Sequence, residues 1–542
     1  MWRLPMNSTR PRLLAGALAL SLTLAACSGG GGSDDDASTA AGGGGAISVG
    51  VTDPAQIIPG RQTVAYDFSM AVWSSLTWAD DAGELTMLAA ESVESDDATT
   101  WTITLEDGWT FHDGAPVTAQ DYVDSWNAVA YGPNAFENTG QLANIVGYAD
   151  LNPAEGEPTT TEMSGLTVVD DLTFTVELTG PDGQFPLQLS QGQTAMYPMP
   201  ASAADDFEAY NRHPVGNGPF ALTDDYVENE PLVVERYEDY QGPAPSVDRI
   251  SFVPYADTTT AYTDVQAGNL DVVGVPASRL QQAPADFGDR LYSFEAPGIS
   301  YLGLPLWDER YSDIRVRQAI SMAIDRETID EVIYGGTFTP ATALTPAVEA
   351  GTPEGICGEL CEYDPDAAKA LLDEAGGFDG TIDIYYPGGI GLDELYTAIA
   401  NQLRQNLGVE SVATPSTDWA EFYETRLNGD VDGPFFSRWG ALYPSQQNTL
   451  RAFYVEDGGC ANCIPYYEPE VAELIATADA QVDAADAADA YAAVQERIME
   501  DFPAPPLFFE TYSYVTSERV ADLPTSAVGN PTYAAVTLAE GA

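Results

Sequence analysis

Apolar residues recur along this chain with two different periods, and their alternation limits the possible folds more than any other feature. At residues 101–105 every second side chain is bulky and apolar, the pattern of a half-buried strand, and residues 172–178 repeat it. Helical periods, with capping and glycine stop signals at most of their ends, predict helices at residues 313–336, 364–377, 395–408 and 471–499. Strands and helices that interleave in this way predict α/β or α+β lobes, and they argue against a sandwich or a helix bundle.

The N-terminus has the composition of an export signal. Arg3, Arg10 and Arg12 make a basic start, and an apolar run follows at residues 13–26. Because a helix needs roughly 20 residues to cross a bilayer, this run is too short to span one and fits a signal peptide. The sequence LAAC at its end resembles the lipobox of bacterial lipoproteins, in which the cysteine, here Cys27, is acylated and becomes the mature N-terminus.

The next segment cannot build a core. Residues 28–45 contain only Gly, Ser, Thr, Ala and Asp, a composition typical of a flexible linker. We therefore predict a signal peptide at residues 1–26, a lipid-anchored linker at 27–46, and a folded body on the outer face of the cytoplasmic membrane. The lipid anchor would be its one attachment to that membrane.

The charge of the chain excludes one class of partner. Asp and Glu number 84 against 20 Lys and Arg, a formal net charge of −64, and Lys369 is the one lysine. Affinity for nucleic acids depends on basic side chains that neutralise phosphates, so we expect no nucleic acid partner. A hydrophobic content of 44% is that of a folded protein rather than a disordered one.

Four cysteines remain after Cys27, and an even number in an exported protein indicates disulfides. Three connectivities are possible from the sequence. We favour the local pairs Cys357–Cys361 and Cys460–Cys463, because each pair lies in a glycine-rich loop that can bend. Cys460 and Cys463 also have the spacing of a redox motif, but the flanking glycines and proline do not fit the strand and helix that such a motif requires.

Few residues could support catalysis. The two histidines, His112 and His213, are too few for a His-rich metal site, and no Gly-x-Ser-x-Gly elbow accompanies either of them. Phosphate-binding glycine motifs are also missing from the sequence. We therefore predict a protein that is not an enzyme and that carries no cofactor and no metal.

Five segments in one order resemble the family 5 solute-binding proteins of ATP-binding-cassette importers, which take up oligopeptides, dipeptides and nickel chelates. The segments are WTITLEDGWTFHDGAPVTAQD (101–121), PVGNGPF (214–220), AGNLD (267–271), RVRQAISMAIDR (315–326) and YDPDAAKALLDEAG (363–376). In the first of them, Thr118 can cap the helix that follows. The resemblance covers roughly residues 47–540.

The resemblance implies a two-lobed, class II periplasmic-binding-protein-like α/β fold, with a hinge between the lobes and an extra domain in the first lobe. The expected boundaries are domain I at 47–85, 206–298 and 511–542, domain II at 86–205, and domain III at 299–510. A ligand would bind between the lobes and stabilise their closed state. The implied function is capture of peptides and delivery to the membrane permease, by a protein that we expect to be a monomer.

The same resemblance implies ligand contacts. DWAEFYETR (418–426) resembles a family segment whose Trp packs on the ligand and whose Arg binds its carboxylate, which points to Trp419 and Arg426. FFSRWGALYP (435–444) resembles the family's ligand strand, so Trp439, Gly440 and Ala441 are candidates. Tyr512 corresponds to a Tyr that often faces the ligand. The alternative for Trp419 and Arg426 is a purely structural role.

One position departs from the family pattern. The peptide binders of this family have an Asp after the Ala, where it pairs with the α-amino group, and this chain has Leu442. A buried ammonium group without a carboxylate is costly, so either another acid replaces the Asp or the ligand has no free amine. A sugar, an opine or a metal chelate therefore remains an alternative to a peptide, and a secreted hydrolase is a further alternative.

Overall fold

The computed structural model describes residues 44–80, 83–190, 192, 196–456 and 458–541. The predicted signal peptide, Cys27 and all but the last residues of the predicted linker lie outside this range. Within it, no helix is long and apolar enough to cross a membrane.

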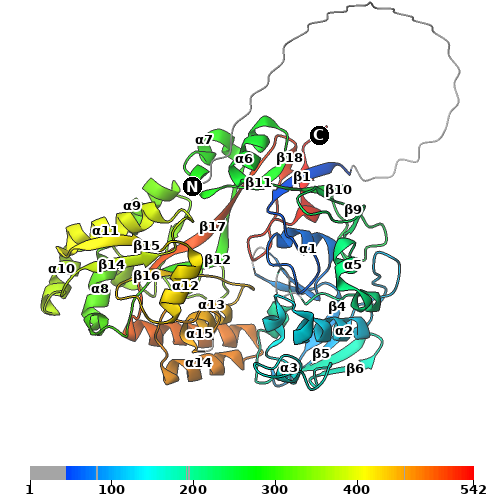
Figure 1. Cartoon of the computed structure of the whole chain (residues 1–542), viewed down its shortest axis with the longest axis horizontal. Coiled ribbons are helices and arrows are strands. Elements are labelled where there is room, and N and C mark those ends of the chain that lie inside the picture. Colours follow the sequence, from blue (N-terminus) through cyan, green and yellow to red (C-terminus); the bar gives the residue numbers. More distant parts are fainter. Residues whose placement is uncertain (1–43, 81–82, 191, 193–195, 457, 542) are drawn as a thin grey trace, which may run out of the picture. The chain divides into compact units, whose positions relative to one another are not determined.

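A mixed sheet of eleven strands is the largest element of the fold (Figure 1). In spatial order its strands are β15 (Ser411–Pro415), β14 (Ile382–Tyr386), β16 (Phe435–Gly440), β12 (Leu291–Gly303), β17 (Pro506–Thr516), β11 (Val272–Gly274), β1 (Ala46–Val51), β10 (Arg249–Pro254), β9 (Leu232–Arg236) and β8 (Phe220–Leu222), with β13 (Thr339–Pro340) paired to β17. One side of the sheet therefore comes from the middle of the chain and the other from its first half.

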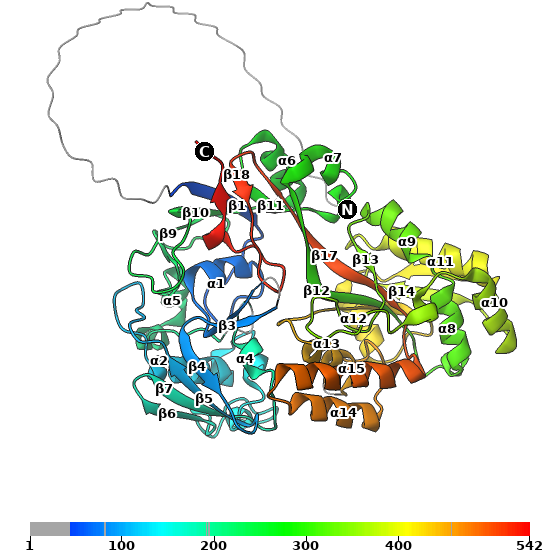
Figure 2. The same ribbon diagram turned by 180° about the vertical axis from the view of Figure 1, so that it is seen from behind.

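The long antiparallel strands β12 and β17 join these two sides, and Figures 1 and 2 show them running beside each other. One half of β12 also pairs with β16, and the opposite half of β17 also pairs with β11. Their register shifts between Glu295 and Ile299, where Ala296-Pro297-Gly298 interrupts the pairing. Because proline has no N–H to donate, Pro297 explains why the ladder breaks at this point.

A separate antiparallel sheet lies within the predicted domain II. Its order is β4 (Ala90–Glu94), β5 (Thr100–Leu105), β7 (Thr173–Glu177) and β6 (Leu166–Asp170). The strands expected at residues 101–105 and 172–178 are thus confirmed. Helix α2 (Ala119–Ala130) packs on this sheet, with Tyr122 stacked on Phe174 at 5.8 Å between ring centroids. The Thr118 side chain accepts from Asp121 N, which confirms the predicted cap.

The prediction of one helix over residues 313–336 is wrong, because this segment forms separate helical elements. Helix α8 (Ile314–Met322) is followed by α9 (Arg326–Ile329) and one π-helical turn at Asp330–Tyr334. Asp313 caps α8 as expected, but Asp325 caps α9 by accepting from Thr328 N at 2.9 Å. A second capping residue inside an apolar periodic segment therefore starts a new helix.

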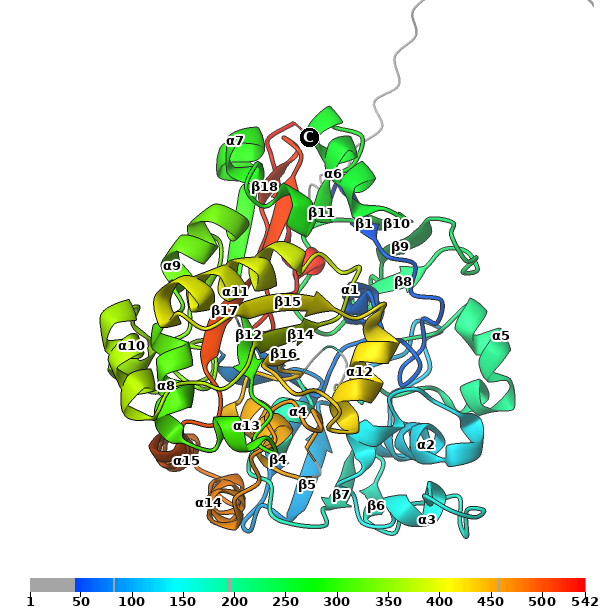
Figure 3. The same cartoon turned by 60° about the vertical axis from the view of Figure 1, so that its left-hand side comes forward.

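The other predicted helices have clear counterparts. Helices α10 (Pro365–Glu374) and α11 (Asp393–Leu407) match the predictions at 364–377 and 395–408. Helix α11 contacts β14 and β15, and Figure 3 shows it running beside β15. The segment 471–499 forms two helices, α14 (Pro469–Asp479) and α15 (Ala484–Asp501), which pack side by side. The Asp483 side chain caps α15 and so marks the break.

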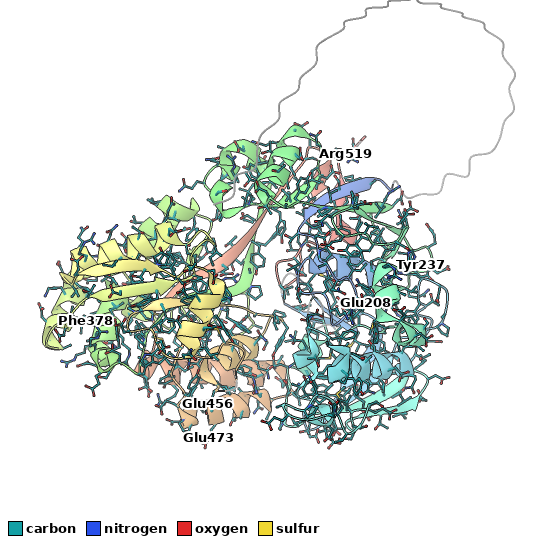
Figure 4. All side chains as sticks on the ribbon, in the orientation of Figure 1. Glu208, Tyr237, Phe378, Glu456, Glu473 and Arg519 are labelled. Carbon is teal, nitrogen blue, oxygen red and sulfur yellow. A yellow bond between two sulfur atoms is a disulfide. The ribbon has the colours of Figure 1, made fainter. Side chains whose placement is uncertain are left out.

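The remaining elements are short. The helices are α1 (Tyr66–Val72), α3 (Tyr148–Leu151), α4 (Phe185–Gln188), α5 (Phe207–Arg212), α6 (Thr258–Ala267), α7 (Ala283–Phe287), α12 (Trp419–Leu427) and α13 (Gln446–Tyr454), and the small sheets are β2 (Thr77–Ala79) with β3 (Leu85–Met87) and β18 (Val520–Asp522) with β19 (Thr537–Leu538). Arg519, labelled in Figure 4, donates to Asp271 Oδ2 and to Ala46 O at 2.8 Å each. These bonds tie the C-terminal segment to β1.

The described part of the chain contains two disulfides. Cys357 is bonded to Cys361 and Cys460 to Cys463, which are the two local pairs favoured from the sequence.

Candidate ligand-binding site

Trp439, Gly440 and Ala441 lie where β16 leaves the sheet. Gly440 stands opposite Gly298 of β12, and Ala441 N donates to Pro297 O at 2.6 Å. The next turn is held by Asn448, whose Oδ1 accepts from Trp439 Nε1 at 2.8 Å and from Leu442 N at 3.0 Å. One amide thus fixes both the indole ring and the backbone after Ala441.

Tyr512 of β17 belongs to the same group. A Cβ atom on Gly440 would lie 3.8 Å from the Tyr512 hydroxyl, so the two residues adjoin. The Tyr512 ring packs in turn on Gly529, which has a φ of +76° and would clash with the ring if it carried a side chain. The structure therefore brings four of the six predicted ligand residues together.

An ion pair that the sequence analysis did not identify lies beside them. The Glu510 carboxylate accepts from Nε and Nη2 of Arg438, and the Glu510 side chain is 7% exposed. Burial alone would lower the pKa of Arg438, but the charge and hydrogen bonds of Glu510, together with Tyr512, outweigh burial and raise that pKa. Glu510 is the acid that adjoins Gly298 and could replace the Asp missing at Leu442, yet Arg438 already neutralises it. Only a contact between two distant strands creates this pair, which explains why no local pattern indicated it.

The other two predicted residues lie on α12. Trp419 is 46% exposed, and its ring contacts Phe436 of β16 at 5.8 Å between centroids. Phe436 and Gly440 are four residues apart on one strand, about 13 Å at the usual rise. Trp419 thus contacts the opposite end of β16 from Gly440.

Arg426 is a buried cation. It is 3% exposed, and its guanidinium lies 5.6 Å from the ring centroid of Phe422 and 5.5 Å from that of Tyr423. Burial lowers the pKa of Arg426. Among the described residues no carboxylate lies within ion-pair distance of it, and its Nε has no hydrogen-bond partner. A buried guanidinium that has no acidic partner can donate hydrogen bonds to an anionic group of a ligand.

A second polar cluster joins the predicted domains II and III. Gln447 Nε2 donates to Asp182 Oδ1 at 2.9 Å, and Ser445 Oγ donates to Gln184 Oε1 at 2.8 Å. Burial raises the pKa of Asp182. Arg451 is also engaged, since its Nη1 donates to Asp479 Oδ2 at 2.6 Å. Arg438 and Arg451 are therefore both ion-paired.

Comparison with known proteins identifies a family and relatives that this chain resembles in sequence. A sequence model described as "Bacterial extracellular solute-binding proteins, family 5 Middle" matches residues 84–459, well over half of the chain. The murein peptide-binding protein MppA of Escherichia coli is 26% identical over 468 residues, which cover 84% of this chain and 86% of MppA. YgiS of Escherichia coli, described as a probable deoxycholate-binding periplasmic protein, is 26% identical over 431 residues, 76% of this chain and 77% of YgiS.

The solved structures agree on the fold. The unliganded open form of MppA superposes with a TM-score of 0.79 at 24% identity and covers 91% of this chain and 96% of MppA. The fold is therefore the two-lobed, class II periplasmic-binding-protein-like α/β fold, and the members of this family are binding proteins rather than enzymes. This chain belongs to the bacterial extracellular solute-binding proteins of family 5.

Proposed function

We propose that this protein is the solute-binding lipoprotein of an ATP-binding-cassette importer, anchored through Cys27 outside the cytoplasmic membrane, and that it captures peptides between its two lobes and delivers them to the permease. Domains I, II and III would have the boundaries given above. Strands β12 and β17 would act as the hinge, because they connect the two sides of the large sheet. A ligand that contacts both lobes would favour the closed state.

The observation that carries this proposal is the buried, carboxylate-free guanidinium of Arg426. Arg426 is buried in a chain with 84 acidic residues, and among the described residues its guanidinium has neither an acidic partner nor the carbonyl partners that hold Arg326, so it is available for a ligand. We infer that Arg426 binds the α-carboxylate of the peptide and that the exposed ring of Trp419 packs on the adjacent residue. Trp439, Gly440, Ala441 and Tyr512 would line the peptide farther along β16.

A second candidate is supported by one residue and one relative. Leu442 removes the family's partner for an amine, and YgiS carries the name of a binding protein for deoxycholate, an apolar carboxylate without an amine. A carboxylated solute that is not a peptide could use Arg426 in the same way.

Ligand capture from a mixture tests both candidates. The full chain in mild detergent is incubated with a peptic digest of casein or with deoxycholate, desalted, and its bound molecules are identified by mass spectrometry. We expect a series of peptides with varied side chains to be retained. We expect Arg426→Met to reduce retention at least tenfold, because the carboxylate loses its charged partner.

Two comparisons complete the test. Arg249→Met removes an exposed arginine on β10 and should retain peptides like the wild type. A digest whose carboxyl groups have been amidated should bind poorly even to the wild type. Retention of deoxycholate without peptides would favour the second candidate, and equal retention by wild type and Arg426→Met would refute the role of Arg426.

A further inference from the structure

A cavity of about 800 Å³ lies apart from all six predicted ligand residues. Its walls come from α1, from the β2–β3 hairpin, and from the loops at residues 240–246 and 524–535. This volume falls within the range of about 300–1,000 Å³ that small-molecule sites occupy. We call it the acidic aromatic cavity, after two kinds of side chain in its lining that bear on what it could bind.

The first kind is acidic. Asp67, Asp80, Glu91 and Glu106 line the acidic aromatic cavity, whereas none of its described lining residues is Lys, Arg or His. Glu91 and Glu106 are exposed, and Asp67 is half-buried. The described lining therefore holds acidic side chains and no basic ones, which gives the cavity a negative potential. Such a potential favours a positively charged guest.

Asp67 is the most informative of these acids. Its Oδ1 is buried, and within the part of the chain that the structure describes it has no hydrogen-bond partner and no arginine or lysine within ion-pair distance. Burial raises the pKa of Asp67 to about 7. The carboxyl group is thus held in an unfavourable setting that a bound cation would relieve.

The second kind is aromatic. The rings of Trp73, Trp78, Trp109, Tyr197, Tyr240 and Tyr533 line the same cavity. Aromatic faces attract organic ammonium groups through the ring quadrupole, and sites for such groups combine several rings with a carboxylate. An inorganic cation would need several oxygen ligands at short range instead. The lining therefore distinguishes an organic cation from a metal ion.

From this combination we propose that the acidic aromatic cavity binds an organic ammonium group, with Asp67 as its counter-ion. The proposal does not depend on peptide capture at Arg426. The loop at residues 524–535 adjoins both places, since Thr525 and Pro531 line the cavity while Gly529 packs on Tyr512.

Isothermal titration calorimetry with charged and neutral probes tests the proposal. The full chain in mild detergent is titrated with choline and with 3,3-dimethylbutan-1-ol, which has the same shape without the charge. A second pair, trialanine amide and N-acetyltrialanine amide, presents or lacks a primary ammonium group and has no carboxylate for Arg426. We expect the charged member of at least one pair to bind at least tenfold more tightly than its neutral partner.

Two variants locate the binding. Asp67→Asn keeps the side-chain shape and should weaken binding of the charged probe at least tenfold. Asp383→Asn on β14 removes another acid whose pKa is raised by burial, outside the cavity, and should bind like the wild type. Which pair responds tells whether the guest is a quaternary or a primary ammonium ion. Equal binding of charged and neutral probes, no binding of either cation, or unchanged binding by Asp67→Asn would overturn the proposal. The casein digest would still report separately on peptide capture.

Discussion

Replacement of Arg326 by methionine is expected to lower the free energy of unfolding by about 4 kcal/mol, because buried carbonyls lose their donor. The guanidinium is 2% exposed, and its Nη1 donates to Ser321 O at 3.1 Å and to Ile324 O at 3.3 Å. Its Nε donates to Pro506 O of β17 at 2.9 Å. Arg326 thus fixes the break between α8 and α9 to the long strand β17.

Urea unfolding of three variants measures this effect. Arg326→Lys should also be strongly destabilised. The planar guanidinium donates to several carbonyl oxygens at once, and one ammonium group cannot reach all of them. Burial already lowers the pKa of Arg326 to about 10, so a lysine there would lose its proton more readily still. Arg404→Met, at a side chain 47% exposed, should change stability by less than about 0.5 kcal/mol. If Arg326→Met and Arg404→Met unfold alike, Arg326 does not hold these segments.

The second large effect is a pH dependence that Glu349 imposes. Glu349 is fully buried and accepts from Thr449 Oγ1 at 2.8 Å, and no described residue forms a hydrogen bond with its Oε2. Burial raises its pKa well above the ordinary value. Because the unfolded chain ionises at the ordinary pKa of 4.5, folding stability is lost as the pH rises from there to the folded pKa. The loss from this one group can reach about 1.4 kcal/mol per pH unit.

Glu349→Gln removes this titration. We expect the variant to gain stability over the wild type as the pH rises from 5 to 8, when both are unfolded in urea at each pH. The matched control is Glu359→Gln, which changes an exposed acid in the 3-10 helix Gly358–Cys361 and should follow the wild-type curve. A constant difference between Glu349→Gln and the wild type at every pH would contradict this account.

Local patterns predicted the elements that local chemistry determines. The alternation at residues 101–105 predicted β5, and Thr118 predicted the start of α2, because side-chain period and capping act within a few residues. The prediction of one helix at residues 313–336 was wrong because of local capping as well. Asp325 caps a second helix inside this segment, and apolar periodicity alone did not indicate that cap. The glycine stops at 376 and 408 were predicted correctly, because Gly408 is the C-cap of α11 and Gly376 follows Ala375, the C-cap of α10.

Contacts between distant segments could not be predicted in this way. Arg438 and Glu510 are 72 residues apart in sequence, and Gln447 and Asp182 are 265 apart. The acidic aromatic cavity likewise combines residues near 67 with residues near 533. The sequence indicated candidate ligand residues on α12, β16 and β17 through family resemblance, but their separation into two groups along β16 required the fold.

Small-angle X-ray scattering tests the central claim, capture of a guest between two lobes, most directly. Profiles of the protein are recorded without ligand and with saturating peptide taken from the casein-digest experiment. Closure of the lobes predicts a smaller radius of gyration and a shorter maximum dimension in the bound state. Profiles that superpose while the peptide is shown to be bound would contradict the account.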